Sequence, residues 1–385
     1  MNEIQMVDLT TQYNKIKSEI DATILDVVRS GKYINGEAVD RFADELSNYL
    51  SVKYVIPCAN GTDALQIALM ALDLQPGDEV IVPAFTYIAA IEAIALLQLK
   101  PVVIDVDPQT FNLNVNQIEQ AISPRTKAII PVHLFGQTVN MEPLMQVARK
   151  HGLFVIEDNA QSIGSTYTFS NGEKKQAGTI GDIGTLSFFP SKNLGCFGDG
   201  GAMLTNDESL ARKLQMIASH GQSRKYIHDQ IGCNSRLDTL QAGILLAKLP
   251  HLNEFIEARR KAAQYYNNQL RELSEFLEIP SCIASSTHVY HQYTLKIKQN
   301  QRDHLQKHLK EKGIPSMIYY PLPVQNQPAY KNLTSVRGCV NETDKLCSSV
   351  LSLPMHTELN ETQLKFITDQ LKQYEILSGT SECNH

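Results

Sequence analysis

The 385-residue chain lacks the patterns that would assign it to a membrane or to nucleic acid. No stretch reaches the roughly 18 uninterrupted apolar residues that a membrane-spanning helix needs, and the most apolar segment, Ile88–Leu99, is broken by Glu92 and Gln98. The N-terminus has no basic start followed by an apolar run, so we expect no secretory signal. Basic residues are not in excess, because 35 Lys and Arg oppose 41 Asp and Glu and the net charge is −6. We therefore expect neither a membrane nor nucleic acid as a partner.

Cysteine and histidine also lack the spacings of disulfide and metal sites. The seven cysteines include no CxxC pair, and the eleven histidines include no HExxH pattern. Cysteines scattered in this way are typical of reduced thiols in a cytoplasmic protein rather than of a disulfide framework. We expect a cytoplasmic chain without a bound metal.

Residues 52–205 alternate short apolar runs with segments that are apolar at helical spacing. The spacing predicts helices at Asp63–Leu72 and Met141–His151. It predicts strands at Tyr54–Pro57, Glu79–Val82, Pro101–Asp105, Ala128–Val132, Phe154–Glu157 and Thr185–Phe188. Strand and helix alternating at this interval indicate an α/β fold with a mostly parallel sheet covered on both faces. Ligands of such sheets bind at the carboxyl ends of the strands.

The pattern divides the chain into a large domain, a smaller domain and a tail. Residues 1–250 form the large domain, in which residues 13–50 are predicted to be one or two amphipathic helices. Residues 251–376 are predicted to be a smaller α/β domain, and residues 377–385 a frayed tail. The smaller domain is expected to contain a long helix, a strand and two further helices, at Leu252–Leu273, Tyr290–Ile297, Arg302–Lys312 and Glu361–Tyr374.

A lysine in a glycine-rich segment is the first candidate for chemistry. The segment Ser187–Gly201 begins at the end of an apolar strand and contains Lys192. An amine that attacks a carbonyl must be partly desolvated and needs backbone room around it. Taken alone, the pattern favours a solvated lysine in a loop, and only its context supports a catalytic role.

A turn of small residues after the first strand is a candidate anion site. It leads from the strand into a helix, and the amides of a helix N-terminus bind anions when a hydroxyl lies beside them. The helix start at Gly61, Thr62 and Asp63 is therefore a candidate anion site, although a plain N-cap by Thr62 or Asp63 is at least as compatible with the pattern. The segment is not a P-loop, because the second glycine and the lysine of that motif are missing.

Two further strand ends carry carboxylates and an aromatic side chain. Glu157 and Asp158 end a buried strand, where a carboxylate must be paired with a metal, a lysine or a protonated ring nitrogen, or else cap a helix. Tyr87 follows another strand, and it is either a core residue or a flat surface for a ring. Asp105 and Asp107 offer a rival site, because DxD pairs hold the metal of some nucleotide-sugar transferases, but we favour an ordinary turn there.

These features are compatible with one chemistry when they are combined. A phosphate cradle, a strand-end carboxylate, an aromatic plate and a loop lysine at the carboxyl ends of one sheet are what pyridoxal 5'-phosphate requires. The lysine binds the aldehyde, the carboxylate keeps the ring nitrogen protonated, and the helix end holds the phosphate.

The chain also resembles the StrS/DegT-type sugar aminotransferases, which have the type I fold of pyridoxal-phosphate enzymes, that of aspartate aminotransferase. The resemblance extends from about Asp8 to Leu371. It rests on six segments in a fixed order, Asn60–Leu65, Glu157–Gln161, Ser187–Lys192, Gly198–Gly201, Asn234–Ala242 and Ser352–His356.

The resemblance implies a role for each matching residue. Lys192 would bind the aldehyde of the cofactor and, once released, carry a proton between the donor Cα and the cofactor. Asp158 would pair with the pyridinium nitrogen, Gln161 would contact the ring hydroxyl, and Tyr87 would stack on the ring. The phosphate ligands would be Gly61, Thr62, Asp63, Ser187 and, from the neighbouring subunit of a homodimer with shared active sites, Asn234.

Within the family the chain resembles the branch that aminates a UDP-linked 3-keto-2-acetamido-glucuronic acid. Arg236 would then bind the uronate carboxylate, or a carboxylate of the amino donor L-glutamate. That branch has His-Tyr-Pro where this chain has Tyr319 and Tyr320 before Pro321, so the sugar pocket is expected to differ there. The matching segments are Cys58–Ile67, Pro190–Gly201, His220–Gln222 and Asn234–Gln241.

The expected reaction is transfer of an amino group from L-glutamate to C3 of UDP-2-acetamido-2-deoxy-ribo-hexuluronate, for a surface polysaccharide such as the O-antigen of lipopolysaccharide. The alternative acceptor is a 3- or 4-keto deoxyhexose linked to dTDP, UDP or GDP. Relatives that dehydrate sugars carry histidine in place of the lysine. A more distant alternative is a metal-dependent glycosyltransferase built on Asp105 and Asp107. A non-catalytic regulator on the same fold is disfavoured, because we find no basic appendage or extra domain.

Overall fold

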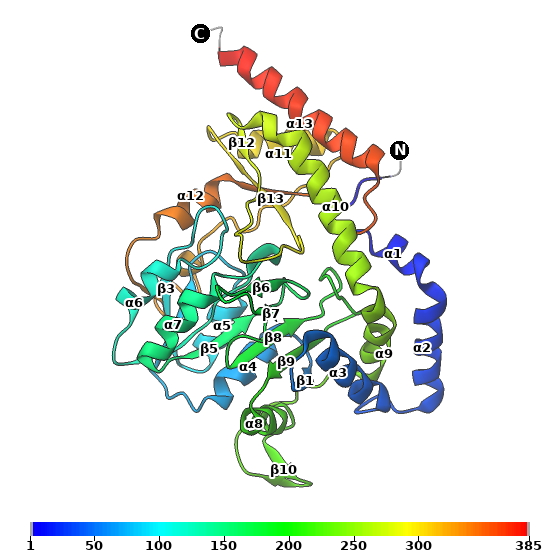
Figure 1. Cartoon of the computed structure of the whole chain (residues 1–385), viewed down its shortest axis with the longest axis vertical. Coiled ribbons are helices and arrows are strands. Elements are labelled where there is room, and N and C mark those ends of the chain that lie inside the picture. The colour runs from blue at the N-terminus through cyan, green and yellow to red at the C-terminus, as the bar shows by residue number, and fades with distance from the viewer. Residues whose placement is uncertain (1–2, 383–385) are drawn as a thin grey trace.

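The computed structural model describes residues 3–382, which form a large α/β body and a smaller lobe beside it (Figure 1). The body is built on an eight-stranded sheet with the order β1-β9-β8-β5-β4-β2-β3-β14. Neighbouring strands are parallel except in the two pairs that include β9. In that order the strands are Tyr54–Cys58, Gly201–Thr205, Ile183–Ser187, Phe154–Asp158, Thr126–Ile129, Glu79–Pro83, Lys100–Ile104 and Ser335–Val336.

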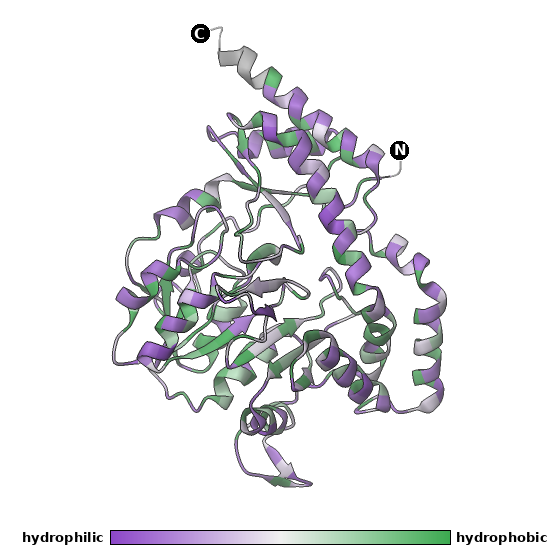
Figure 2. Cartoon of the chain, viewed as in Figure 1, coloured by the Kyte–Doolittle hydropathy of each residue, from purple (hydrophilic) through white to green (hydrophobic). Residues whose placement is uncertain are grey.

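Helices cover both faces of this sheet. In β2, Val80 and Val82 are buried with residues of α4 and α5, while Ile81 is buried on the opposite face with residues of α7. Because both faces are covered, most residues in the middle of the central strands are apolar, and Figure 2 shows much of this sheet in the green of apolar residues. The helices of the body are α1 (Leu9–Lys15), α2 (Lys17–Ser30), α3 (Glu37–Leu50), α4 (Gly61–Ala71), α5 (Ala89–Leu96), α6 (Ile118–Ala121), α7 (Met141–His151), α8 (Glu208–Ala218) and α9 (Thr239–Lys248).

The smaller lobe packs helices against a three-stranded antiparallel sheet, β12-β13-β15. There are also two short hairpins, β6-β7 and β10-β11, of which β10-β11 projects from the body (Figure 1). The lobe consists of α10 (Leu252–Leu270), β12 (Leu277–Glu278), β13 (Tyr293–Ile297), α11 (Arg302–Glu311), α12 (Asn341–Ser349), β15 (Val350–Leu353) and α13 (Glu361–Glu382). The hairpin strands are Thr166–Thr168, Lys174–Gln176, Gln222–Arg224 and Ile227–His228.

The predicted elements occur in the structure with small shifts at their ends. Helix α7 has the predicted bounds, and the predicted end of the long helix at Leu273 is a separate 3-10 turn, Arg271–Leu273. Strand β13 begins at Tyr293 rather than at Tyr290. Helix α13 continues past Tyr374 to Glu382, and residues 383–385 of the predicted tail lie outside the described residues. None of the helices within residues 3–382 combines the length and apolar character that a bilayer crossing requires.

Segments on both sides of the predicted boundary at residue 250 pack with the other part of the molecule. Ile4 is buried in the core of the smaller lobe, and the N–H of Met355 donates to the carbonyl of Met6 (3.3 Å). In the opposite direction β14 returns to the large sheet, where it pairs with β3. The predicted division of the chain therefore has exceptions at both ends, and the domain boundary itself stays a prediction.

Candidate active site

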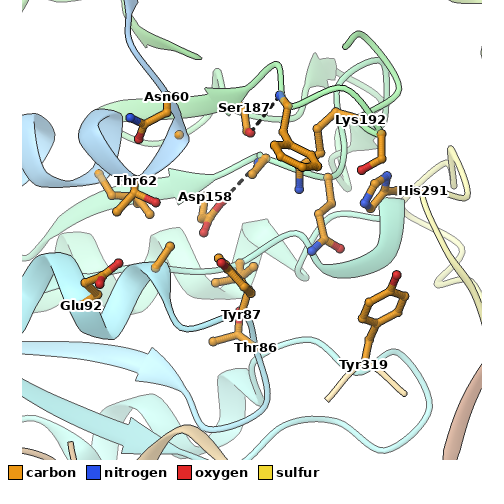
Figure 3. A pocket seen from close by; sticks show the side chains of 18 of the residues that line it. Asn60, Thr62, Thr86, Tyr87, Glu92, Asp158, Ser187, Lys192, His291 and Tyr319 are labelled. Carbon is orange, nitrogen blue, oxygen red and sulfur yellow. Dashed lines mark hydrogen bonds between the residues drawn. The ribbon is translucent and has the colours of Figure 1, made fainter. Parts of the chain in front are cut away.

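A cavity of about 700 Å³ lies at the carboxyl ends of β2, β5 and β8, where the smaller lobe meets the body. Figure 3 shows side chains from both parts converging on it. Asn234 and Arg236 do not line it. The other ten of the twelve predicted site residues do: Gly61, Thr62, Asp63, Tyr87, Asp158, Gln161, Ser187, Lys192, Tyr319 and Tyr320.

Lys192 extends into this cavity from the loop that follows β8. The loop turns at once, since the N–H of Lys192 donates to the carbonyl of Phe189 (2.8 Å). Burial lowers the pKa of Lys192 from 10.5 to about 8, against the opposing effect of the Asp158 carboxylate. An amine with this pKa is partly neutral near physiological pH, as a nucleophile that attacks a carbonyl must be.

Asp158 is the last residue of β5 and is 7% exposed. Burial raises its pKa, and the N–H of Ala160 (3.1 Å), Lys192 and His133 only partly offset this effect. A buried carboxylate with a single neutral donor is expensive to keep ionised unless a cation lies beside it. The Asp158 side chain is therefore suited to pair with a cationic group in the cavity.

Glu157 lies on the opposite face of β5 and already has its partners. Its carboxylate accepts hydrogen bonds from the N–H groups of Ile180 and Gly181 (2.6 Å each) and from Nε2 of His133 (2.7 Å). Burial by itself would raise the pKa of Glu157. The combined effect of these donors is larger, so the pKa lies below its usual value of 4.5. Nδ1 of His133 accepts the N–H of Val139 (3.2 Å), so the hydrogen bond to Glu157 is donated by Nε2. The sequence left open which carboxylate is available to a ligand, and the structure assigns Asp158.

Helix α4 begins against the end of β8 and presents its first amides to the cavity. Oδ1 of Asn60 accepts the N–H of Asp63 (2.8 Å), so Asn60 is the N-cap and the alternative of a cap by Thr62 or Asp63 is wrong. The N–H groups of Gly61 and Thr62 have no intrahelical acceptor, because they lie in the first turn. Together with the hydroxyls of Thr62 and Ser187 they fit a phosphate.

Gly61 is required at this position because the backbone and β8 nearly touch. A Cβ at Gly61 would lie 2.8 Å from Cβ of Ser187. We expect Gly61→Ala to push α4 away from β8 and to weaken binding of pyridoxal phosphate roughly tenfold, about 1.4 kcal/mol. Visible absorbance during titration with the cofactor measures this affinity. Gly243→Ala is the matched control, because a Cβ there meets nothing closer than 3.4 Å; equal affinities in the two variants would contradict the prediction.

Aromatic and amide groups form the remaining wall. Tyr87 is 59% exposed, and its ring centroid lies 6.2 Å from that of Tyr320. Gln161 is held at both ends, because its Oε1 accepts the N–H of Phe135 (2.8 Å) and its Nε2 donates to the hydroxyl of Tyr320 (3.3 Å). Tyr319 is half-buried beside them. An exposed ring and a fixed amide suit the face and the edge of a planar heterocycle.

Other side chains also line the cavity and were missed by the sequence analysis. Thr86 has a buried Oγ1 without a hydrogen-bond partner among the described residues. Because Thr86 directly precedes Tyr87, the sequence could have indicated that it also lines the cavity. Glu92 and Asp199 add carboxylates. His291 and Gln292 come from the smaller lobe, and no local pattern places them here. The cavity as a whole offers a phosphate cradle, a carboxylate, an aromatic ring and an amine, and these groups fit pyridoxal phosphate.

Asn234 and Arg236 lie elsewhere. Arg236 borders a separate polar cavity of about 560 Å³ between α3, β1 and α8. Within residues 3–382 neither side chain has a hydrogen bond or an ion pair, although Arg236 is half-buried. Their own chain therefore does not use these groups at the lysine cavity.

Asp105 and Asp107 are structural. Asp105 is buried and accepts hydrogen bonds from the N–H groups of Glu342 (2.9 Å) and Thr343 (2.8 Å) at the start of α12. Asp107 accepts the N–H groups of Gln109 and Thr110 (2.9 Å each), which confirms the predicted turn. Among the described residues there is no group of three His, Cys, Asp or Glu side chains placed to hold a metal ion.

The sequence of the chain is similar to those of known aminotransferases and their relatives. Residues 14–372 match the profile of the DegT/DnrJ/EryC1/StrS aminotransferase family. The chain is 45% identical over 372 residues (96% of this chain, 98% of the relative) to a pleiotropic regulatory protein of Geobacillus stearothermophilus. It is also 45% identical over 364 residues (94% and 98%) to the UDP-2-acetamido-2-deoxy-3-oxo-D-glucuronate aminotransferase of Pseudomonas aeruginosa.

Two further relatives extend the comparison. The chain is 43% identical over 370 residues (96% and 97%) to the UDP-N-acetyl-3-dehydro-alpha-D-glucosamine 3-aminotransferase of Acidithiobacillus ferrooxidans. The crystal structure of NtdA from Bacillus subtilis with bound cofactor PMP superposes with a TM-score of 0.88 at 33% identity, covering 97% of this chain and 85% of that one. The predicted fold class and cofactor are thereby confirmed.

Proposed function

Because the chain belongs to the DegT/DnrJ/EryC1/StrS aminotransferase family, whose members depend on pyridoxal phosphate, we propose that it aminates a nucleotide-linked 3-keto uronic acid. The acceptor is UDP-2-acetamido-2-deoxy-ribo-hexuluronate, the donor is L-glutamate, and the product is UDP-2-acetamido-3-amino-2,3-dideoxy-glucuronate. The observation that carries the proposal is the meeting of Lys192, Asp158 and the α4 cradle in one cavity. The name of the Pseudomonas relative supports the choice of sugar.

Each residue of the cavity has a task in this reaction. The cofactor supplies a ring that withdraws electrons from the carbon that loses its proton. Lys192 would hold the cofactor's aldehyde, and its amine would move a proton at the substrate carbon. Asp158 would keep a positive charge on the ring nitrogen. The remaining groups orient the cofactor: Tyr87 on its face, Gln161 at its hydroxyl, and Gly61, Thr62, Asp63 and Ser187 around its phosphate.

A homodimer with shared sites accounts for Asn234 and Arg236. Both lie outside the cavity of their own chain, and their side chains lack partners within residues 3–382, so we propose that they complete the cavity of the partner subunit, Asn234 at the phosphate and Arg236 at a carboxylate. They directly follow the β10-β11 hairpin, on and beside which Tyr226 and Ile231 are 79% and 85% exposed. Apolar side chains left this exposed are common at contacts with another chain.

The pathway and the compartment are part of the proposal. A 3-amino uronic acid on UDP is a building block for a bacterial surface polysaccharide such as the O-antigen of lipopolysaccharide. The absence of a CxxC pair and of a disulfide-like cysteine pattern favours a reducing compartment, the cytoplasm.

The visible spectrum tests the proposed function. The purified protein supplied with pyridoxal phosphate is expected to show a yellow band that bleaches when L-glutamate is added, after which a panel of UDP-, dTDP- and GDP-linked keto sugars identifies the acceptor. Restored colour with the hexuluronate but not with 3- or 4-keto deoxyhexoses supports the proposal. A protein that binds the cofactor but aminates no sugar would be a regulator, and one that stays colourless would refute the proposal.

Arg236→Ala is expected to separate uronate from neutral substrates. Loss of a charge-assisted fork worth about 1.5–3 kcal/mol predicts a KM at least about tenfold higher for the keto-uronate, with little change for UDP-N-acetyl-3-dehydro-glucosamine. Steady-state kinetics with both sugars measures the ratio. Arg212→Ala is the control, because Arg212 borders the same second cavity but pairs with Glu208 on its own helix. An equal loss for both sugars would exclude a role in uronate binding.

Mixed dimers test whether the sites are shared. Lys192→Ala chains are expected to be inactive, and Arg236→Ala chains to keep at most about a tenth of the uronate activity at low substrate, whereas a mixed dimer has one site with both residues intact. Random pairing is expected to restore about a quarter of the activity, since about half of the dimers are mixed and each has one complete site. No recovery after subunit exchange would refute the shared site.

A further inference from the structure

Two side chains of helix α9 form hydrogen bonds with the loop that carries Lys192. We define this lysine loop as residues 188–200, between the end of β8 and the start of β9. The N–H of Phe197 donates to Oε1 of Gln241 (2.9 Å), and Nζ of Lys248 donates to the carbonyl of Gly195 (2.6 Å). Both side chains belong to α9, so one rigid element holds the loop at two neighbouring points.

Lys248 is an unusual group to find at such a contact. It is 2% exposed, and among the described residues no carboxylate pairs with it. Its ammonium lies 5.7 Å from the ring centroid of Phe197, and burial lowers its pKa to about 8. An unpaired buried cation destabilises the folded chain relative to an apolar side chain of the same size. A lysine here therefore needs a reason other than stability.

The loop is built so that a displacement at Gly195 reaches Lys192. A Cβ at Gly195 would lie 2.3 Å from the carbonyl oxygen of Pro190, so the two backbone segments are in direct contact. The N–H of Cys196 donates to the carbonyl of Phe188 (2.8 Å) and closes the loop at its base. Pro190 precedes Lys192 by two residues. Gly195, whose carbonyl binds Lys248, is thus in direct contact with Pro190, and the backbone at Pro190 leads into Lys192.

We propose that Lys248 and Gln241 are positioning residues that hold the lysine loop so that Nζ of Lys192 stays aimed at the cofactor's aldehyde. The proposal rests on the proposed role of Lys192. Gln241 orients the loop through a backbone N–H, and Lys248 orients it through a backbone carbonyl. Because neither side chain lines the cavity, both act only through the loop.

Lys248→Met is the first test, because methionine keeps the length of the side chain and removes the ammonium. The cofactor-loaded variant is expected to release pyridoxal phosphate at least tenfold faster, and the pH midpoint of its visible band is expected to shift by half a unit or more. The melting temperature of the cofactor-free variant is expected to stay within a few degrees of the unaltered protein or to rise. A merely structural lysine would instead lower the melting temperature and leave the pH midpoint unchanged.

Gln241 supplies an independent pair of variants. Gln241→Met loses the acceptor for Phe197 N–H and is expected to reproduce the spectral shift, whereas Gln241→Glu keeps an acceptor oxygen and is expected to restore the original spectrum. Lys213→Met, on the surface of α8, controls for loss of a lysine. Unaltered release rates and pH midpoints in both Lys248→Met and Gln241→Met would refute the proposal. If the unaltered protein forms no band that depends on Lys192, the proposed function fails instead.

Discussion

Lys192→Ala is expected to lose the yellow colour and at least about a thousandfold of the aminotransferase rate. The variant lacks both the amine that binds the cofactor's aldehyde and the base that moves the proton, and positioned acid–base groups alone contribute about 10²–10⁴-fold. Visible absorbance and single-turnover bleaching with L-glutamate measure the two losses separately.

The control for this variant is Lys213→Ala. Lys213, on α8, forms an ion pair with Asp73 and does not line the cavity. Its loss is expected to leave colour and rate unchanged. A Lys192→Ala protein that kept its band at the original wavelength would show that another amine holds the cofactor.

Asp158→Asn is expected to reduce the rate roughly a hundredfold or more while the protein still binds the cofactor's phosphate. Removing one partner of a buried charge pair typically costs 2–5 kcal/mol, and each 1.4 kcal/mol is a factor of ten. Stopped-flow absorbance after mixing with L-glutamate reports the rate. A loss that follows only from weaker cofactor binding, and vanishes at saturating pyridoxal phosphate, would contradict the assigned pairing.

In the cofactor-free protein, Asp158→Asn is expected to increase the stability of the folded chain. Burial raises the pKa of Asp158 above its ordinary 3.8, so the folded state disfavours the ionised form. As the pH rises above 3.8 the unfolded chain loses this proton more readily than the folded chain, so stability falls, and the penalty fades as the pH is lowered below 3.8, where both chains are largely protonated. Asp158→Asn is therefore expected to melt at a higher temperature than the unaltered protein at pH 7, by a margin that narrows on acidification.

Much of the site was predictable because its chemistry is local in sequence. Asp158 ends a buried strand, Lys192 and Tyr87 each follow one within a few residues, and parallel strands bring their carboxyl ends together at one edge. The α4 cradle likewise follows β1 directly. A correct assignment of strands therefore placed most cofactor ligands without any knowledge of long-range contacts.

The remainder depends on contacts that a single sequence does not specify. Glu157 and Asp158 are adjacent and chemically alike, and they differ in that the N–H groups of residues 178–181 and the ring of His133 bind Glu157. His291 arrives from another lobe, and Lys248 meets Gly195 from 53 positions away. Asn60 caps α4 in place of its neighbours because its side chain alone points back at the Asp63 N–H.

The repeated crossing of the chain between body and lobe limits how the protein can be taken apart. A fragment that starts at residue 251 would lack Ile4 from its core and would carry β14 without the strand that it pairs with. Exchange of the smaller lobe between relatives would therefore have to transfer the extreme N-terminal segment as well and leave β14 behind. The two parts are therefore not interchangeable modules. We expect substrate preference among such enzymes to change in evolution by point substitutions around the cavity rather than by exchange of the smaller lobe.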